Sequence, residues 1–574
     1  MDRRVIWAIV LMMFIAIAPT FLVKKPLGTG RTGSTGETGR PPAVQPAGPD
    51  AQAPVAAPGQ AAGQDTAAPT VAAAADSATP QGDEQVVVVR SALYTYRIST
   101  RGGRLVSAEL ADYASMAPGE EGRAELLRRG DALLGLTVVA GRDTIPLDRW
   151  VFEPSATELT VTGPTPLVLT GTQGDLGVTL TYTFTPDYRI AVSGQVTGLG
   201  GQGGFALVNL GTGLRNTERD SVQNEREYAV VVKGADAERT NFRSLDGGET
   251  RVLSGPFEWA AVKSKYFVAS LFAFDSTGGQ RGRITGVSAA APAGAGKNPT
   301  AVRVLASIPV TAAGAVSYAA YAGPLEYDRL TAIGHDFDDV NPYGWPGFRT
   351  MVRFFAVPVR WLLVQMHESL NITYGIVLVL FGLLVRVLLW PLNQKAMRAN
   401  MQMMDVQPQL KAAQERYKDD PQMLQKEMFR LYKEYNVNPL SGCWPMLLPM
   451  PVLFALFFVF QNAIELRGQS FLWLPDLSRP DPLYIIPLLM GISMFGLSKV
   501  GQMGMEPNPQ MKMMLYVMPV MMTVLFVNFP SGLNLYYTVS NIASIPQQWL
   551  IAKERKKRLA RQIVEVKTKK PKKA

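Results

Sequence analysis

One apolar run, at residues 372–392 (ITYGIVLVLFGLLVRVLLWPL), most strongly limits what this chain can fold into. A helix needs about 20 mostly apolar residues to cross a bilayer, so the run is long enough. It carries one charge, Arg386, and an arginine at the bilayer centre costs roughly 2.5–3.5 kcal/mol on insertion scales. Such a residue usually faces a helix bundle or a water-filled cavity. Alternatively, because Arg386 lies nearer the Pro391 end of the run, its side chain reaches the lipid head groups.

The other apolar residues are also concentrated, at 5–23 and from residue 372 onward, although they make up an ordinary 47% of the 574 residues. This distribution predicts a polytopic α-helical membrane protein with a soluble insert. Six spans are expected: an N-terminal membrane anchor at 1–25, span 2 at 372–392, span 3 at 444–464, span 4 at 483–498, span 5 at 512–529 and span 6 at 533–552.

The first 84 residues predict an anchor and a tether. The apolar core from Val5 to Val23 is longer than that of a usual signal peptide, and no small-residue cleavage site follows it closely, which favours an uncleaved anchor over a signal peptide. Residues 26–84 hold almost no large apolar groups to offset the entropy of ordering. They predict a disordered periplasmic tether.

Residues 85–335 predict a soluble antiparallel β-sandwich. In the stretch VTLTYTFT, at 178–185, apolar residues alternate with threonines, which is the pattern of a half-buried strand. Similar short runs are separated by turns that contain Gly, Pro or Asp. The segment has no Gly-rich phosphate loop and no nucleophile motif, so we expect a binding or spacing domain.

Residues that would support catalysis or metal binding are scarce. Cys443 is the single cysteine, which excludes an intramolecular disulfide and a multi-cysteine metal site. His335 and His367 lie outside the spans and share no ligand spacing, so no metal or other cofactor is expected. No span holds a histidine or a paired carboxylate, which disfavours an intramembrane hydrolase. We therefore expect no catalytic residues and no enzymatic activity.

The segment at 346–368 predicts an interfacial amphipathic helix. Arg349, Arg353 and Arg360 share one helical face, and aromatic residues such as Phe354 and Trp361 crowd the remainder. A membrane-spanning helix is the weaker alternative here, because it would bury three arginines.

The polar segment at 393–441 predicts a helical hairpin, with helices at about 395–418 and 422–436. Three methionines, Met397, Met401 and Met404, recur at i, i+4 and i+7. Methionine gives a soft, adaptable apolar surface of the kind that promiscuous binders use, although an ordinary hairpin seam has the same spacing.

Charge predicts the orientation. The hairpin and the tail at 553–574 are rich in Lys and Arg, so the positive-inside rule makes both cytoplasmic. Six spans then make the N-terminus cytoplasmic and the β-domain periplasmic. The tail carries 11 Lys or Arg against 2 Asp or Glu, most of the net charge of +10, and suits either anionic lipids or ribosomal RNA.

The last span carries a polar stripe that changes the interpretation of Arg386. Its members recur at i, i+3, i+7, i+10 and i+14 on one helical face; they are Asn534, Tyr537, Asn541, Ser544 and Gln548. A polar stripe is costly in lipid unless it faces protein or water. No carboxylate in the spans neutralises Arg386, and an unpaired buried cation is costly. The two helices therefore predict a hydrophilic groove, with a hydrogen-bonded helix seam as the alternative.

Three stretches resemble the YidC/Oxa family of membrane protein insertases, in its Gram-negative type with a large periplasmic domain. They are NPLSGCWPMLLPMPVLFALFF at 438–458, FPSGLNLYYTVSN at 529–541 and the segment from Arg386 to Pro391. The order of anchor, tether, β-domain, interfacial helix, hairpin and further spans also resembles that family. Two positions depart from it: Gly382 stands where a hydroxyl is frequent, and Pro449 stands where a glutamine is common.

The resemblance implies a cell inner membrane protein with a five-helix insertase core. The groove of that core opens to the cytoplasm and the inner leaflet, is closed to the periplasm, and contains an arginine that corresponds to Arg386. The resemblance further implies a β-super-sandwich-like periplasmic domain, akin to sugar-mutarotase folds, and partnership with the Sec translocon and the ribosome.

The function expected from these features is insertion and chaperoning of membrane proteins. Nascent chains would meet the hairpin methionines, place a polar flank beside Arg386, and leave along spans 3 and 5. The expected contacts on that exit are Met446, Met450, Met518 and Leu525. The rival function is a channel or solute transporter with Arg386 as an anion site, which the lack of an internal sequence repeat disfavours.

Overall fold

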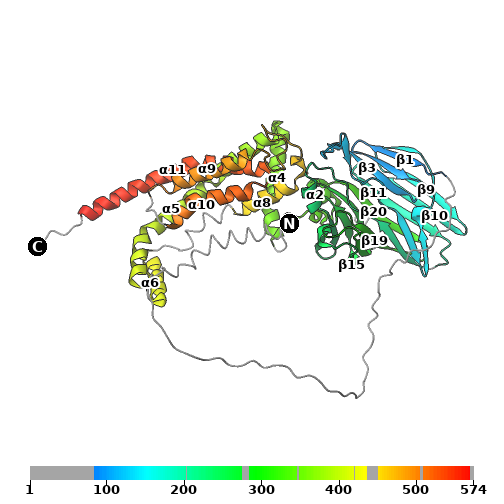
Figure 1. Ribbon diagram of the computed structural model, residues 1–574, viewed down its shortest axis with the longest axis horizontal. Helices are drawn as coiled ribbons and strands as arrows, with labels where there is room; N and C mark the ends of the chain where they lie inside the picture. The colour runs from blue at the N-terminus through cyan, green and yellow to red at the C-terminus, as the bar shows by residue number, and fades with distance from the viewer. Residues whose placement is uncertain are drawn as a thin grey trace, which may run out of the picture. The chain divides into compact units, whose positions relative to one another are not determined.

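The computed structural model describes residues 83–201, 203–273, 283–344, 348–418, 420–435, 450–504 and 509–568. The expected anchor and nearly all of the expected tether lie outside these ranges. In the described part, the strands all precede residue 325 and the long helices all follow it (Figure 1). The residues before 325 are called the β-domain below.

The largest sheet of the β-domain has nine antiparallel strands in the order β14-β13-β16-β17-β20-β11-β10-β9-β7. Its strand β10 (Leu176–Phe184) contains the alternating VTLTYTFT stretch and buries Val178, Leu180, Tyr182 and Phe184, which confirms that prediction. The other strands are β7 (Glu153–Pro154), β9 (Thr165–Gln173), β11 (Arg189–Thr197), β13 (Ala229–Lys233), β14 (Ala237–Asn241), β16 (Trp259–Lys263), β17 (Phe267–Phe272) and β20 (Ala315–Pro324).

Two smaller sheets complete the β-domain. The six-stranded sheet has the order β15-β18-β19-β12-β5-β6. Its strands are β15 (Thr250–Phe257), β18 (Ile284–Ala290), β19 (Arg303–Val310), β12 (Gly204–Asn209), β5 (Leu136–Ala140) and β6 (Asp143–Pro146). The five-stranded sheet consists of β4 (Arg123–Glu125), β3 (Arg104–Ala114), β2 (Tyr94–Ser99), β1 (Val86–Ser91) and β8 (Glu158–Val161). Strands β1 and β8 pair in parallel, a departure from the expected all-antiparallel sandwich.

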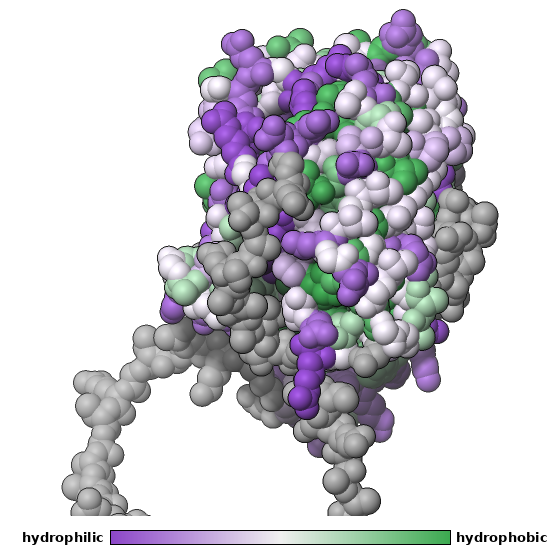
Figure 2. Space-filling model, turned by 90° about the vertical axis from the view of Figure 1, so that its right-hand side faces the viewer, coloured by the Kyte–Doolittle hydropathy of each residue, from purple (hydrophilic) through white to green (hydrophobic). Residues whose placement is uncertain are grey.

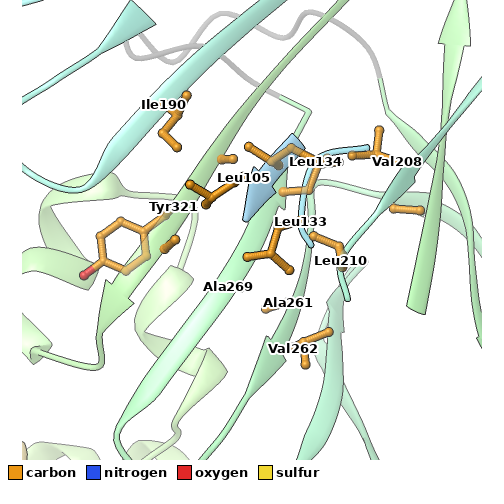
Figure 3. Packing of buried hydrophobic residues seen from close by; sticks show 14 of the residues in the cluster. Leu105, Leu133, Leu134, Ile190, Val208, Leu210, Ala261, Val262, Ala269 and Tyr321 are labelled. Atoms are coloured by element: carbon orange, nitrogen blue, oxygen red, sulfur yellow. The ribbon is translucent and has the colours of Figure 1, made fainter. Parts of the chain in front are cut away.

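Buried side chains from all three sheets form one hydrophobic cluster. Figure 3 shows part of it, to which Leu105 of β3, Ile190 of β11 and Val208 of β12 contribute from different strands. Burial of this apolar area stabilises the domain by roughly 25 cal/mol per Å². The face drawn in Figure 2 mixes hydrophilic residues with scattered hydrophobic ones. Three short helices lie between strands: η2 (Leu147–Arg149), α2 (Ser221–Arg226) and η3 (Phe242–Ser244). Two more follow the last strand: α3 (Tyr327–Ile333) and η4 (Phe337–Val340).

Eight further helical elements follow in the described part of the chain. They are α4 (Arg349–Leu370), α5 (Tyr374–Arg416), α6 (Pro421–Glu434), α8 (Met450–Asn462), η6 (Ile464–Leu466), α9 (Ile485–Gly501), α10 (Pro509–Phe526) and α11 (Ser531–Thr568); η6 is a single 3-10 turn. Helix α11 packs against α5 and α9, α10 packs against α9, and α4 packs against α8.

One described helix is long and apolar enough to cross a membrane, the part of α5 over Tyr374–Pro391. Shorter apolar stretches lie in α8, α9 and α10, at Val452–Asn462, Ile485–Gly501 and Met511–Phe526. The number of six spans and the five-helix core therefore stay predictions.

The basic face of α4 forms ion pairs with acidic residues of the protein. Arg360 is buried. It is buried because it has acidic partners: Nη1 donates to Asp328 at 3.1 Å and Nε donates to Glu465 at 3.1 Å. Arg353 likewise pairs with Asp338 at 2.9 Å.

The opposite face of α4 is apolar and exposed, at Met351, Phe354 and Trp361. Exposed aromatic residues on a helix whose charges are neutralised within the protein suit a lipid interface.

The expected hairpin begins inside α5. The helix of span 2 does not end at 392 but runs unbroken to Arg416, and α6 folds back against it. Val406, Leu410 and Ala413 of α5 form the seam with Leu431 of α6. The side chains of Met397, Met401 and Met404 lie outside the described residues.

Candidate functional site

Arg386 lies on α5, twelve residues after its start, and is half-buried. Its Nε is shielded from solvent, and no hydrogen-bond partner for it is found in the described part of the chain. Within the same residues Arg386 forms no ion pair with an Asp or Glu. A guanidinium in this position keeps donors free for an acceptor that arrives from outside the protein.

The face of α11 that meets α5 carries Tyr536, Ser540 and Gln547. Gln547 Nε2 donates to the carbonyl of Trp390 at 3.1 Å. The phenol of Tyr536 lies within electrostatic range of the Arg386 guanidinium, and its side chain is hydrogen-bonded to Ser540. These residues recur at i, i+4 and i+11, a second helical stripe that the sequence displays but that we did not single out.

The predicted stripe on α11 lies one step around the helix and mainly faces α9 and α10. Asn541 Nδ2 donates to Ser493 Oγ of α9 at 3.2 Å. Asn534 Nδ2 donates to the carbonyl of Phe526, the last residue of α10, at 3.0 Å. Gln548 lies beside Gly501 at the end of α9. This half of the stripe has the geometry of the alternative interpretation, a hydrogen-bonded seam between helices.

The stripe also contains buried polar atoms that have no hydrogen-bond partner among the described residues. Ser544 Oγ donates to the carbonyl of Ser540 within its own helix. The hydroxyl of Tyr537, Oδ1 of Asn534 and Oε1 of Gln548 are buried and find no partner among the described residues. A buried polar group without a partner costs about 1–3 kcal/mol. Such atoms favour water or a polar ligand nearby, so α11 is polar toward both of its neighbours.

Two glycines, Gly382 and Gly491, allow neighbouring helices to approach closely. A Cβ at Gly382 of α5 would come within 3.3 Å of Val539 Cγ1, so α5 and α11 touch through Gly382 just one turn before Arg386. On the other side of α9, a Cβ at Gly491 would overlap Thr523 Oγ1 of α10.

The residues at 463–484, named the α8–α9 loop here, cover one end of the helices. The N–H groups of Ser531 and Gly532, at the start of α11, donate to the carbonyls of Arg479 and Leu477 at 2.6 and 2.9 Å. Asp481 is fully buried and accepts from the N–H of Ile486 at 2.7 Å, which caps the start of α9. Phe471 of the loop packs so closely on α5 that a Cβ at Gly375 would overlap its ring.

The predicted exit contacts are only partly visible. Met446 and the side chain of Met450 lie outside the described residues. Met518 and Leu525 on α10 are half-buried, whereas Val517, Val520 and Val524 on the same helix are more than half exposed. The apolar face that α10 leaves open thus includes these valines, together with the exposed Met514 and Tyr516.

The β-domain buries one ionic cluster, which is enclosed rather than a reaction centre. Lys263 Nζ donates to Asn341 Oδ1 at 2.8 Å, and Arg239 pairs with Glu227 at 2.9 Å. Burial, together with the charge of Arg239, lowers the pKa of Lys263 to about 7. Burial alone would raise the pKa of Glu227, but Arg239 and Lys263 outweigh it and lower that pKa to about 2.

No group of three or more His, Cys, Asp or Glu side chains in the described ranges could hold a metal ion. His335 instead contacts Glu258 at 3.1 Å through Nδ1, and Nδ1 of His367 lies 2.7 Å from the carbonyl of Ile372. Both histidines thus have local partners.

Comparisons with known proteins cover nearly all of the described chain. A family model described as the 60Kd inner membrane protein matches residues 365–558, and one described as the YidC periplasmic domain matches residues 86–362. The membrane protein insertase YidC of Chloroherpeton thalassium is 32% identical over 504 residues, 82% of this chain and 83% of that protein. The membrane protein insertase YidC of Prosthecochloris aestuarii is 30% identical over 515 residues, 83% of this chain and 84% of that protein.

Among solved structures, one match is to a crystal structure titled as an active YidC insertase with its first transmembrane domain resolved. It is 17% identical, covers 81% of this chain and 94% of that one, and has a TM-score of 0.31.

Proposed function

Because this chain belongs to the YidC family of membrane protein insertases, we propose that it inserts and helps to fold integral membrane proteins through a hydrophilic groove containing Arg386. It would do so alone or with the Sec translocon. The family is one of inner membrane proteins, and the β-domain matches its periplasmic domain. The proposed topology has six spans and cytoplasmic termini. We propose that insertion involves no enzymatic turnover.

The observation that supports a client-binding groove is the environment of Arg386. In the described part of the chain the guanidinium interacts with the phenol of Tyr536 and forms no ion pair with a carboxylate. A fixed acidic partner would saturate the guanidinium, whereas hydroxyls leave its charge available. Attraction between the guanidinium and an acidic client flank is strengthened by the low dielectric of a membrane protein interior.

The groove would lower the cost of moving a polar flank into the membrane. Each unsatisfied polar group costs several kcal/mol in hydrocarbon. The proposed groove residues on α11 would solvate the flank together with water from the side of that helix that faces α9 and α10, next to the side that faces Arg386; they are Asn534, Tyr537, Asn541, Ser544 and Gln548. The apolar part of the client would then leave along α8 and α10, driven by burial of its apolar surface in lipid.

The test replaces Arg386 and measures insertion of clients in proteoliposomes. We expect Arg386→Ala to reduce insertion of clients with acidic translocated tails by about tenfold, the effect of losing roughly 1.4 kcal/mol of charge attraction. Arg386→Lys keeps the charge and should retain most of the activity. Clients with neutral tails should be affected much less by either substitution.

Lys499→Ala is the matched control, because Lys499 is an exposed cation at the end of α9. Equal insertion of acidic-tailed clients by wild type and Arg386→Ala, at matched protein levels, would remove Arg386 from the mechanism.

The rival function, a channel or transporter with Arg386 as an anion site, is disfavoured by the α8–α9 loop, which packs across the ends of α5, α9 and α11. Liposome flux assays separate the two. Anion or solute flux by purified protein that cannot insert clients would favour the rival.

The proposed partners beyond nascent membrane proteins are the Sec translocon, the ribosome and anionic lipids. The exposed face of α4, with Phe354 and Trp361, supports the lipid interface. The exposed Phe429 on α6 supports a cytoplasmic docking surface on the hairpin. The methionines proposed for client capture are Met397, Met401 and Met404.

A further inference from the structure

The α8–α9 loop is tied to the β-domain by buried groups at its start. Ile464 is 3% exposed and belongs to the hydrophobic cluster of the β-domain, not to that of the helices. Three residues later, Arg467 Nε donates to Glu218 Oε1 at 2.8 Å, and Nη2 donates to the carbonyl of Thr217 at 3.1 Å. The side chains of Arg467 and Glu218 are only 5% and 10% exposed.

Two further contacts hold the same short segment. The guanidinium of Arg467 lies 5.4 Å from the ring centre of Phe267 on β17, a cation–π distance. Glu465, two residues earlier, accepts from Arg360 of α4, which also binds Asp328 of α3. The start of the loop is thus fixed to the β-domain directly and through α4.

The other end of the same loop is fixed to the helices. Asp481 caps α9, and the carbonyls of Leu477 and Arg479 accept from the first residues of α11. About ten residues separate the two anchoring regions, so the position of the first restricts the second.

We propose that the β-domain positions the α8–α9 loop over the ends of the helices, and that Arg467 and Glu218 are the positioning residues of this brace. The role assigned to the β-domain is therefore mechanical: it keeps that end of the groove closed. The proposal concerns a different part of the protein from Arg386 and stands independently of what Arg386 binds.

The ion pair suits positioning better than simple stabilisation. A buried ion pair is often no more stable than well-packed apolar residues in its place, because desolvation offsets the attraction. It does fix direction and register, since a guanidinium that donates to both a carboxylate and a carbonyl has few alternative arrangements.

The test measures hydrogen exchange of backbone amides in the full-length protein in lipid nanodiscs. The readout is the amides of Ser531, Gly532 and Ile486, whose acceptors belong to the loop. We expect Arg467→Met to speed exchange at these amides by about tenfold or more, as a local opening becomes more populated. Efflux of K⁺ from liposomes containing the variant should rise as well.

Three comparisons make the result specific. Arg251→Met is the matched control, since Arg251 pairs with Glu249 at 2.7 Å within the β-domain, away from the loop; it should leave exchange unchanged. The charge swap of Arg467→Glu with Glu218→Arg should restore protection in part. Insertion of neutral-tailed clients reports separately on the proposed function.

If Arg467→Met exposes the β-domain itself, seen as faster exchange in β16 and β17, the double variant Arg467→Met with Glu218→Leu replaces it, because it leaves no unpaired buried charge. Wild-type protection at Ser531, Gly532 and Ile486 in a folded variant that lacks the ion pair would overturn the proposal. Insertion defects of Arg386→Ala, present or absent, do not bear on this outcome.

Discussion

Lys263 is a lysine enclosed completely in a β-sheet, a position that few charged residues occupy without partners. Its neighbours Glu227 and Arg239 come from the turn after α2 and from β14, so the charge balance depends on three separate segments. At this scale the sequence offers little guidance, because Lys263, Glu227 and Arg239 look like surface charges until the sheet brings them together.

The ionic cluster around Lys263 predicts how the stability of the protein changes with pH. The pKa of Glu227 in the folded protein, about 2, lies below its ordinary value of 4.5. Its contribution to stability is therefore complete above about pH 4.5 and is lost as the pH falls toward 2. We expect Glu227→Gln to be less stable at neutral pH, with a difference from wild type that shrinks through this window.

Circular dichroism melting of both proteins in detergent, at steps from pH 6 to pH 3, measures that difference. The Glu153→Gln variant, which changes an exposed carboxylate of strand β7 in the same domain, serves as the control. A difference between wild type and Glu227→Gln that is constant across these pH values would contradict the assignment.

In the candidate groove, the sequence alone predicted Arg386 but not the residues that face it. Arg386 stands out because a charge in an apolar run is conspicuous. The residues that face it do not, because α11 is polar on two adjacent sides and periodicity alone gives no preference. Tyr536 and Gln547 were missed for that reason, whereas Asn541 was selected and lies against α9.

Among the elements, α9 and α10 are joined by a contact that needs a glycine. At Gly491 a side chain would overlap Thr523 Oγ1, which is already engaged with the carbonyl of Pro519 at 2.8 Å. Turning Thr523 away would break that hydrogen bond. The pair therefore fixes how closely the two helices approach.

We expect Gly491→Ala to lower the stability of the helical part by about 1–3 kcal/mol, the usual cost of overpacking. Gly496, five residues later on α9, faces open space, so Gly496→Ala should be neutral or stabilise by about 0.5–1 kcal/mol. Thermal unfolding of both variants in detergent, followed by light scattering, checks the contrast. Equal melting temperatures for the two variants would show that α9 and α10 are not in this contact.

Element types were more predictable than their ends and partners. The strand at 178–185 followed from strict alternation, because one face is buried and the other is not. The continuity of α5 did not follow, because the change from apolar to charged residues at 393 resembles a helix end although helical propensity persists. The parallel pairing of β1 with β8 depends on long-range topology that no local pattern encodes.

For the whole molecule, the contacts of α4 join what the sequence presents as separate domains. Arg360 binds Asp328, next to the β-domain, and Glu465, next to α8. Burial alone would lower the pKa of Arg360, but these two carboxylates raise it, so the guanidinium is charged at any physiological pH.

We expect Arg360→Leu to separate unfolding of the β-domain from that of the helices, giving two calorimetric transitions in place of one. Removing one partner of a buried ion pair costs about 3–5 kcal/mol, because the remaining charges are left uncompensated. Arg349→Leu is the control on the same helix, since Arg349 lies 3.9 Å from Asp339 in a more exposed setting. Identical calorimetric profiles for the two variants would contradict this coupling.

Helix α5 runs without a break from Tyr374 to Arg416, a length of about 65 Å at 1.5 Å per residue. The first helix of the hairpin and Arg386 therefore belong to one continuous helix. A partner bound at the hairpin would tilt the helix at Arg386 only as far as α5 stays straight at Pro391, five residues beyond the arginine, because a helix bends most easily at a proline. We therefore expect that a partner bound at the hairpin can change the position of Arg386 without itself entering the groove.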